Sequence, residues 1–497
     1  MPVFNPYLPL DTYIPDGEPH VFGDRLYVFG SHDKEGGDAY CLLDYEAWSA
    51  PVDDLTAWRC EGTIYRAAQD PTQDPEGKYR QLYAPDVVQG PDGRYYLYYA
   101  LAGGAFTGPI HVAVCDTPAG KYEFYGCVHN PDGSDFDRCI TFDPGVLNDS
   151  GRIWLYYGWA ISAPNLRGLK GVKRKLVKKM MPLLERKMFD KSTEQLRREP
   201  YGIQGSNVVE LEPDMLTVKG EPHRIVPGLI DAEGTSFEGH AFFEASSIRK
   251  IDGIYYFIYS DEKYHELCYA TSEAPDRDFT YRGVLVSSGD LVRDDRREKP
   301  QTEFTTNNHG SLVEVNGQWY IFYHRHTHKT GFSRQGCADK ITRTADGGFL
   351  QAETTSCGLN PGPLPCEGSY PAPIACRICN GEYPLVQSKK PFPHVTHRGN
   401  ERFIAEITNG TRLEYRYFEF NGPCRLTLRL RGTAEGTVSV RIDREEAAAI
   451  QLLPAESWQD HTAELNKKGT CALTLDFSVK GQAELLKLIF EKETRDE

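Results

Sequence analysis

Short runs of aromatic and β-branched residues recur along the chain, and each run begins at a turn residue. Five such runs begin at Asp24, Gly93, Gly151, Gly253 and Gly317, so the intervals between them are 69, 58, 102 and 64 residues. Runs of this kind are typical of buried strands, and further short apolar segments follow them at hairpin spacing. A strand–turn–strand unit repeated in this way predicts a five-bladed β-propeller, with one unit per blade. An ordinary β-sandwich with repeated aromatic strands is the alternative.

One polar residue stands seven to nine positions before each aromatic run. These residues are four carboxylates and one imidazole, namely Asp16, Asp86, Asp143, Glu244 and His309. Because equivalent positions of successive blades face one axis, we expect the five side chains to meet at the centre of the propeller. Any one of the carboxylates alone would more often be a cap or a turn residue. Their regular placement is what indicates a functional site.

The longest interval contains a basic insertion, about residues 165–199, with twelve Lys or Arg and four acidic residues. Apolar residues step along it by three and four, which predicts an amphipathic helix, at Leu169, Val172, Leu176 and Met180. We expect Pro182 to break this helix and to open a second one. The insertion is expected to pack on the propeller or to contact another subunit. A membrane-surface helix and a lid over the site are the alternatives.

The pattern changes in the last third of the chain. The aromatic repeat stops after about residue 356, and a Pro/Gly-rich stretch follows at 360–366. Beyond it, apolar and polar residues alternate with a period of two at 426–431, 437–442 and 472–477. This alternation predicts an antiparallel β-sandwich of jelly-roll size. The sequence therefore predicts an all-β protein, with a propeller over residues 1–360 and a sandwich over 361–497 that either binds carbohydrate or only supports the propeller.

Composition narrows the classes of partner and compartment. A net charge of −15 argues against a nucleic-acid surface, and no apolar run is long enough to cross a membrane. The start of the chain has neither a basic nor an apolar leader region, so we expect a cytoplasmic protein. The thirteen scattered cysteines fit reduced thiols in that compartment. We interpret the lone Cys376-Arg-Ile-Cys379 motif as packing residues, not as a metal site.

The spaced carboxylates suit the hydrolysis of a glycosidic bond. Two carboxyl groups on opposite sides of a sugar hydrolyse it with inversion, since one takes a proton from water and the other protonates the leaving oxygen. A third carboxylate near the acid raises the pKa of that acid. Glu244 follows Phe242 and Phe243, and an apolar environment there would favour its protonated form. Asp86 stands at the start of a predicted strand, and Asp16 lies in a turn-like approach to the first strand.

The motifs around these residues resemble glycoside hydrolase family 43. The resemblance covers residues 5 to 355 and rests on four motifs in order: Asp16 followed by Ser31-His32-Asp33, Ala84-Pro85-Asp86, Phe243-Glu244 before Ser and a basic residue, and His309-Gly310-Ser311. The last hundred residues, with Tyr417 and Trp458, are similar to a family 6 carbohydrate-binding module. The resemblance implies a five-bladed propeller with an Asp base, an Asp that adjusts the pKa of the acid, and a Glu acid.

Carried onto this sequence, the resemblance implies Asp16 as the base, Asp86 as the pKa modulator and Glu244 as the acid. The remaining predicted site residues would contact substrate, and they are His32, Asp143, His309 and Arg334. His309 would lie at the channel centre, where a structural calcium can be held through water. No cofactor is expected for catalysis. Because Asp16-Gly17-Glu18-Pro19 replaces the usual Asp-Pro, Glu18 competes with Asp16 for the role of base.

The expected activity is an inverting glycosidase that removes terminal β-D-xylosyl or α-L-arabinofuranosyl units from oligosaccharides. A β-galactofuranosidase or another furanosidase is the alternative within the enzyme class, and a non-catalytic sugar-binding propeller is the alternative outside it. The expected partner is an oligosaccharide, with neither nucleic acid nor membrane, and a homo-oligomer is an open option.

Overall fold

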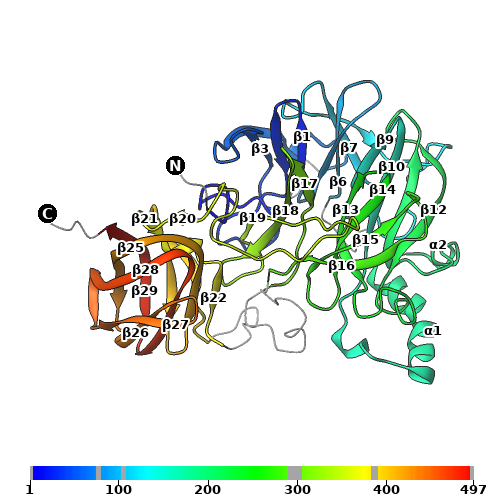
Figure 1. Cartoon of the computed structure of the whole chain (residues 1–497). Coiled ribbons are helices and arrows are strands. Elements are labelled where there is room, and N and C mark those ends of the chain that lie inside the picture. The colour runs from blue at the N-terminus through cyan, green and yellow to red at the C-terminus, as the bar shows by residue number, and fades with distance from the viewer. Residues whose placement is uncertain are drawn as a thin grey trace.

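The first two thirds of the chain form a ring of five small antiparallel sheets, as the aromatic repeat predicts (Figure 1). The computed structural model describes residues 4–73, 80–101, 108–189, 191–288, 305–381 and 390–492. Blade 1 contains β1 (Glu18–Phe22), β2 (Arg25–Phe29), β3 (Tyr45–Pro51) and β4 (Arg59–Tyr65). Blade 2, after the short 3-10 helix η1 (Ala67–Gln69), contains β5 (Asp86–Gln89), β6 (Tyr95–Tyr99), β7 (His111–Cys115) and β8 (Glu123–Cys127).

The other three blades follow in chain order. Blade 3 contains β9 (Gly145–Asp149), β10 (Arg152–Trp159), β11 (Gly205–Leu211) and β12 (Val218–Pro227). Blade 4 contains β13 (Phe242–Ile251), β14 (Ile254–Asp261), β15 (Leu267–Ser272) and β16 (Thr280–Val286). Blade 5 has three named strands, β17 (Leu312–Val315), β18 (Gln318–His326) and β19 (Arg334–Lys340). The five aromatic runs of the sequence are β2, β6, β10, β14 and β18, the second strand of each blade.

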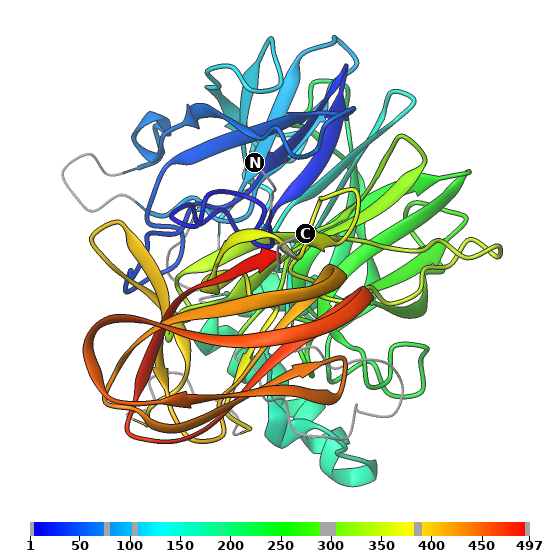
Figure 2. The same ribbon diagram turned by 60° about the vertical axis from the view of Figure 1, so that its left-hand side comes forward.

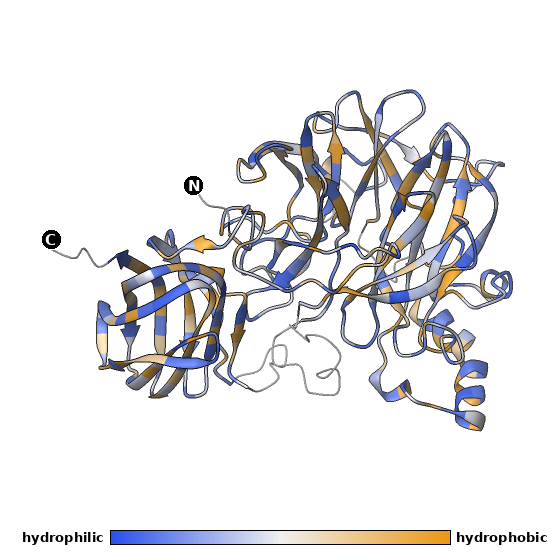
Figure 3. Cartoon of the chain, viewed as in Figure 1, coloured by the Kyte–Doolittle hydropathy of each residue, from blue (hydrophilic) through white to orange (hydrophobic). Residues whose placement is uncertain are grey.

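The aromatic second strands are buried because neighbouring blades pack face to face. Tyr156 of blade 3 stacks on Phe257 of blade 4 with ring centroids 5.8 Å apart, and both side chains are fully buried. Large aromatic side chains bury much apolar area and so contribute strongly to packing. In Figure 3 hydrophobic segments are interspersed with hydrophilic ones along the strands of the ring.

The N-terminal segment closes the ring. The backbone N–H of Tyr7 donates to the carbonyl of Gly336 in β19 at 3.3 Å, and the Asn5 side chain donates to the carbonyl of Ala338 at 3.0 Å. A parallel bridge between Gly17 and Gly310 joins blade 1 to blade 5. A Cβ at Gly310 would lie 1.9 Å from a backbone oxygen of β18, so only glycine fits directly after His309.

The insertion in blade 3 forms two helices after the short 3-10 helix η2 (Pro164–Leu166), namely α1 (Gly171–Met188) and α2 (Thr193–Arg197). The prediction that Pro182 ends the first helix is wrong, because α1 continues through it. Pro removes one backbone hydrogen bond, and buried contacts of Met181 and Glu185 hold the helix on either side. The helix packs on the propeller, where Arg174 and Lys178 bind the loop before β13.

None of the helices in the described part of the chain has the length and apolar character that a membrane crossing requires.

The C-terminal part is a separate β-sheet domain, shown at the left of Figure 1 and turned forward in Figure 2. Its ten strands, together with the 3-10 helix η3 (Ala372–Ile374), are β20 (Leu364–Pro365), β21 (Gly368–Pro371), β22 (Arg377–Cys379), β23 (His394–Arg398), β24 (Glu401–Ile407), β25 (Arg412–Gly432), β26 (Glu435–Ile442), β27 (Glu445–Leu452), β28 (Ala455–Lys480) and β29 (Ala483–Lys492). They form one continuous sheet in which the long strands β25 and β28 pair along most of their length. Alternate residues of these strands point into one apolar core, for example Leu426, Leu428 and Leu430.

Candidate active site

Two of the site residues, and the residue that follows a third, have an unusual backbone conformation. Asp16 and Asp143 precede the inner strands β1 and β9, and their φ values are 57° and 44°. Ala245, which follows Glu244 in β13, has a φ of 72°. Residues other than glycine rarely adopt a positive φ, and such residues cluster at functional sites. The same backbone feature therefore marks the inner strands of blades 1, 3 and 4.

Asp16 is buried among cationic and polar partners. Arg334 Nη1 donates to Asp16 Oδ1 at 2.8 Å, and His324 Nδ1 lies 3.2 Å from the same oxygen. Burial alone would raise the pKa of Asp16, but the Arg334 guanidinium and His324 outweigh it and hold that pKa well below its usual range. The carboxyl group is therefore ionised throughout the neutral range.

Arg334 is itself held by a second carboxylate. Its Nε and Nη2 donate to the two oxygens of Asp33 at 2.9 and 3.0 Å, which is the bidentate geometry that fixes a guanidinium. All three side chains of the Asp16–Arg334–Asp33 chain are almost completely buried. The predicted site residue Arg334 thus binds Asp16 directly.

Glu244 has the opposite electrostatic environment. The Nε1–H of Trp159 donates to Glu244 Oε2 at 3.2 Å. Burial, and next the charge of Asp143, raise the pKa of Glu244. His265, whose pKa burial lowers to about 4, packs on Phe243 beside it and remains neutral. Glu244 therefore keeps its proton at a pH at which Asp16 has lost its own.

Asp143 contacts the strand that carries Glu244 and also lies close to His309. Its Oδ2 accepts a hydrogen bond from the backbone N–H of Ala245 at 3.0 Å and lies 3.8 Å from His309 Nδ1. Burial raises the pKa of Asp143. The charge of His309 lowers it, and the charge of Asp16 raises it. Two buried carboxyl groups in close electrostatic contact resist joint ionisation. Asp143 and Glu244 thus behave as a pair.

Asp86 is placed elsewhere, and the expectation that it raises the pKa of Glu244 does not match this geometry. Its Oδ1 accepts from His20 Nε2 at 2.7 Å and from its neighbouring backbone amide, and its Oδ2 accepts from the amide of Val146 at 2.8 Å. Asp86 therefore bridges the inner strands of blades 1, 2 and 3. The carboxyl group whose charge raises the pKa of Glu244 is that of Asp143, which we expected only as a substrate contact.

Glu18 lies on the same inner strand as His20, and its contacts are structural. Glu18 Oε2 accepts from Arg249 Nη2 at 2.9 Å and from Ser247 Oγ at 3.1 Å. Its other oxygen, Oε1, is buried without a hydrogen-bond partner among the described residues and lies 3.6 Å from His309 Nε2. Burial lowers the pKa of His309, but the neighbouring carboxylates of Glu18, Asp143 and Asp16 raise it to about 9.

The remaining predicted residue, His32, is not part of this group. Its Nδ1 donates to the backbone carbonyl of Asp44 at 2.9 Å, and its ring is half-buried on the loop that carries Asp33. Asp33, His324 and Trp159 also belong to the site and were not predicted from the sequence. Asp33 belongs to the Ser-His-Asp motif, so it could have been included, but nothing in the sequence links Trp159 to Glu244.

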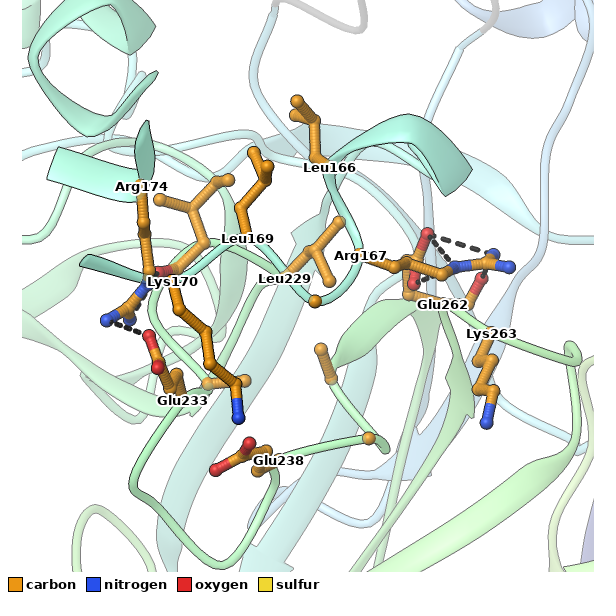
Figure 4. A pocket seen from close by; sticks show the side chains of 15 residues that line it. Leu166, Arg167, Leu169, Lys170, Arg174, Leu229, Glu233, Glu238, Glu262 and Lys263 are labelled. Carbon is orange, nitrogen blue, oxygen red and sulfur yellow. Dashed lines mark hydrogen bonds and ion pairs between the residues drawn. The ribbon is translucent and has the colours of Figure 1, made fainter. Parts of the chain in front are cut away.

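A pocket lies at the rim, between the start of the insertion and blade 4 (Figure 4). Apolar side chains such as Leu166 and Leu229 line it together with charged ones. Arg167 binds the buried Glu262 at 3.0 Å, and Arg174 binds Glu233 at 2.5 Å. These ion pairs attach the segment that leads into α1 to blade 4 and to the loop before it.

The geometry unites an ionised carboxylate, a protonated carboxyl group and a third carboxyl group that maintains the difference. Two carboxyl groups in opposite protonation states are what acid–base hydrolysis of a glycosidic bond requires. On a five-bladed propeller, this site defines a glycoside hydrolase.

Comparison with known proteins identifies the family. The model of glycosyl hydrolases family 43 matches residues 10–194 and 188–349. A xylosidase/arabinosidase of Thermoclostridium stercorarium is 43% identical over 502 residues, covering 97% of this chain and 97% of that protein. The chain belongs to glycosyl hydrolase family 43.

More distant relatives include further enzymes of the xylosidase and arabinosidase type. A xylosidase/arabinosidase of Bacteroides ovatus is 30% identical, covering 64% of this chain and 87% of that protein. Among solved structures, a family 43 β-xylosidase/α-arabinofuranosidase from a compost metagenome, in complex with xylotriose and in a calcium-free form, is 26% identical with a TM-score of 0.50, covering 69% of this chain and 94% of that one. A Xanthomonas citri family 43 enzyme complexed with xylotriose has a TM-score of 0.52 at 24% identity, covering 72% of this chain and 96% of that one, and shares the fold.

Proposed function

We propose that this enzyme removes terminal β-D-xylosyl or α-L-arabinofuranosyl units from oligosaccharides, with inversion of the anomeric configuration. The 43% identity to a xylosidase/arabinosidase over nearly the whole length of both chains supports the substrate class. The observation that carries the mechanism is the contrast between the cationic contacts of Asp16 and the apolar, like-charged environment of Glu244, which shift their pKa values in opposite directions.

In this mechanism Asp16 is the base. Arg334 and His324 keep its carboxylate charged and oriented, so that it can take a proton from a water molecule as that water attacks the anomeric carbon. Glu18 has a structural role instead, because Arg249 and Ser247 hold its Oε2 and its Oε1 lies 3.6 Å from His309 Nε2.

Glu244 is the acid and protonates the leaving oxygen. Trp159 holds one oxygen of its carboxyl group, so the proton is carried by a side chain of fixed orientation. Asp143 takes the modulator role that the resemblance places on Asp86. When Glu244 releases its proton, the repulsion from Asp143 favours its reprotonation for the next cycle.

A panel of nitrophenyl β-D-xyloside, α-L-arabinofuranoside and β-D-galactofuranoside tests the substrate class. We expect kcat/KM for the first two to exceed that for the galactofuranoside by at least about 100-fold, since a mismatched sugar loses several positioned contacts. A preference for the galactofuranoside would overturn the assignment.

We further propose that the channel can hold a structural calcium ion near His309. The buried and unpartnered Glu18 Oε1 supports a cation there, as do ligand atoms of Glu18, His20 and Asp86 within 4.8 Å of one another. Carboxylate oxygens and water are the ligands that calcium prefers. When bound, the ion would supply positive charge at the base of the site. A calcium-dependent rise in Tm that is lost in Glu18→Gln tests this site.

The C-terminal domain is our candidate carbohydrate-binding module, and its closeness to family 6 modules remains a proposal. Trp458 is half-buried, with Arg431 over its ring at 4.0 Å and Phe403 at its edge, so this indole is covered on one face. Affinity electrophoresis of the full chain on arabinoxylan, with Trp458→Ala beside the parent, tests whether the other face binds sugar.

We also propose that the protein acts in the cytoplasm and associates with a second copy of itself through α1. Three apolar side chains of α1 are exposed, with Val172 82%, Leu176 58% and Leu183 68% accessible. The insertion carries +8 (twelve minus four), whereas the rest of the chain carries −23 (−15 minus 8). The basic rim of the helix therefore complements the acidic remainder of a second copy. Fractionation of the source cells tests the proposed cytoplasmic location.

A further inference from the structure

Three side chains of the kind that bind transition metals converge in blade 4, away from the catalytic carboxylates. His240 lies in the loop before β13, Asp261 is the last residue of β14, and Cys268 is the second residue of β15. One ligand atom from each lies within 4.8 Å of the other two. Asp261 and Cys268 are completely buried, whereas the His240 side chain is 20% exposed.

The carboxylate of Asp261 is fixed in place with one oxygen left over. Its Oδ1 accepts hydrogen bonds from the backbone amides of Tyr264 and Glu266 at 3.0 and 3.1 Å, which form the turn after β14. Its Oδ2 is buried and has no hydrogen-bond partner in the described parts of the chain. That oxygen lies 3.6 Å from His240 Nδ1.

The imidazole of His240 is fixed as well. Its ring stacks on Tyr281 with centroids 4.3 Å apart and 9° between the planes, and the Tyr259 hydroxyl donates to its backbone carbonyl at 2.7 Å. Its Nδ1 is buried and likewise makes no hydrogen bond within the described structure.

Asp261 Oδ2 and His240 Nδ1 are thus two buried polar atoms, neither of which has a hydrogen-bond partner among the described residues. Leaving a buried polar atom unpaired is unfavourable, and here two such atoms face each other. The 3.6 Å separation is too long for a hydrogen bond between them. Two ligand atoms bound to one tetrahedral zinc ion at about 2.1 Å lie about 3.4 Å apart, which is close to the separation seen.

We propose that His240, Asp261 and Cys268 form a zinc site. A thiolate, an imidazole and a carboxylate are the ligand types that select Zn²⁺ over the hard cations Ca²⁺ and Mg²⁺. On binding, the Cys268 thiol loses its proton to solvent and its sulfur bonds to the metal, and water completes the fourth position on the His240 side. The ion would tie the segment that leads into Glu244, four residues after His240, to the β14–β15 hairpin.

Metal content and cobalt spectroscopy of the full-length protein test the site. The protein is stripped with chelator, dialysed against Zn²⁺ or Co²⁺, and washed free of unbound metal. We compare Cys268→Ala and His240→Gln with two controls, Cys337→Ala, a buried thiol of blade 5, and His223→Gln, a histidine outside the cluster. Mass spectrometry of the metal should show that the two site variants lose one equivalent of zinc relative to the parent and that both controls keep it.

Cobalt distinguishes this site from the channel. The Glu18–His20–Asp86 group contains no sulfur, so a thiolate-to-cobalt charge-transfer band in the near ultraviolet cannot arise there, and its loss in Cys268→Ala assigns it to Cys268. The band should appear in the parent, in both controls and, weakened, in His240→Gln, and it should vanish in Cys268→Ala. Equal zinc content in parent and site variants, or bound cobalt without that band, would show that His240 and Asp261 form only an ion pair.

Discussion

At the scale of single residues, the site depends on environments that push two similar carboxyl groups in opposite directions. Asp16 lies against a guanidinium that a second carboxylate, Asp33, holds in place. Glu244 accepts a hydrogen bond from an indole N–H and lies within the influence of a like-charged carboxyl group, Asp143. The difference arises from contacts and not from residue type. It is therefore sensitive to substitutions that leave both catalytic groups intact.

The first prediction concerns pH. The pKa of Glu244 is raised to about 8, and the acid acts only while protonated. Activity should therefore be present below that pKa and be lost as the pH rises through it. Asp143→Asn removes a charge that raises this pKa, so the basic limb of kcat/KM should move to lower pH. Asp86→Asn is the matched control and should leave the limb in place. A shift in Asp86→Asn but not in Asp143→Asn would restore Asp86 as the modulator.

The second prediction concerns the proton donor. Glu244→Gln cannot protonate a leaving group, so unactivated xylobiose should lose about 10²–10⁴-fold in kcat/KM. A dinitrophenyl xyloside, whose leaving group needs little protonation, should lose much less. Rates on the two substrates are measured side by side. Equal losses on both would remove Glu244 from the role of acid.

The third prediction concerns the base and the stereochemistry. An inverting site leaves room for water, so the carboxyl groups of Asp16 and Glu244 should be roughly 6.5–9.5 Å apart. Proton NMR of the first product should show the inverted anomer. Asp16→Ala should be inactive and partly rescued by azide, whereas Glu18→Ala should retain most of its activity if it folds. A retained anomer, or an active Asp16→Ala beside a folded but inactive Glu18→Ala, would show that the base is misplaced.

At the scale of elements, the sequence predicts the blades well because each needs one buried aromatic strand. Tyr95–Tyr99 and Ile254–Asp261 form the second strands of their blades as expected. Equal spacing could not reveal which inner carboxylates turn into the site. That depends on the positive φ of Asp16 and Asp143, whereas Asp86 begins a regular strand and bonds to His20.

The helical insertion shows a second limit of sequence patterns. Spacing by three and four identifies a helix with an apolar side, but it does not say what covers that side. In the structure Val172 and Leu183 lie on the open side of α1, while Met181 and Glu185 face the propeller. Pro182 did not end the helix, because such contacts outweigh a single missing hydrogen bond.

The fourth prediction tests the exposed side of α1. Leu176→Glu with Leu183→Glu should convert an associated form to monomer in light scattering, with Tm of the monomer nearly unchanged, because neither side chain is buried within the chain. Leu453→Glu, at a 70% exposed leucine of the C-terminal domain, is the control and should change nothing. A parent that is already monomeric at all concentrations would contradict the contact. Vesicle binding lost only in the double variant would indicate a membrane surface instead.

At the scale of the whole molecule, the C-terminal domain supports a loop of the propeller that carries a site residue. Glu35 follows Asp33 by two residues, and it accepts from Arg402 Nη2 at 2.8 Å and from the Tyr13 hydroxyl at 2.8 Å. Burial opposes ionisation, but hydrogen bonds from His328, Tyr13 and Arg402 lower the pKa of Glu35 to about 2. A second cross-domain contact joins Lys329 to Glu406 at 2.6 Å.

The fifth prediction follows from this connection. Arg402→Gln removes a partner of the largely buried Glu35, at a cost of about 1–3 kcal/mol. Since Asp33 on the same loop orients Arg334, and Arg334 holds Asp16, kcat/KM should fall by roughly tenfold if about 1.4 kcal/mol of that cost reaches the transition state. Initial rates and Tm are measured for this variant and for Arg429→Gln, which breaks an exposed pair with Asp460 in the same domain.

The two readouts separate positioning from packing. The exposed pair contributes little, so Arg429→Gln should match the parent in both. Arg402→Lys keeps a charge near Glu35 and should recover part of the lost rate, although it cannot reproduce the planar donor geometry. If the C-terminal domain only packs against the propeller, Arg402→Gln will lower Tm and leave kcat/KM unchanged. A loss of rate that Arg402→Lys partly restores is the outcome expected of a domain that holds Glu35, and through its loop Asp33, in the working position.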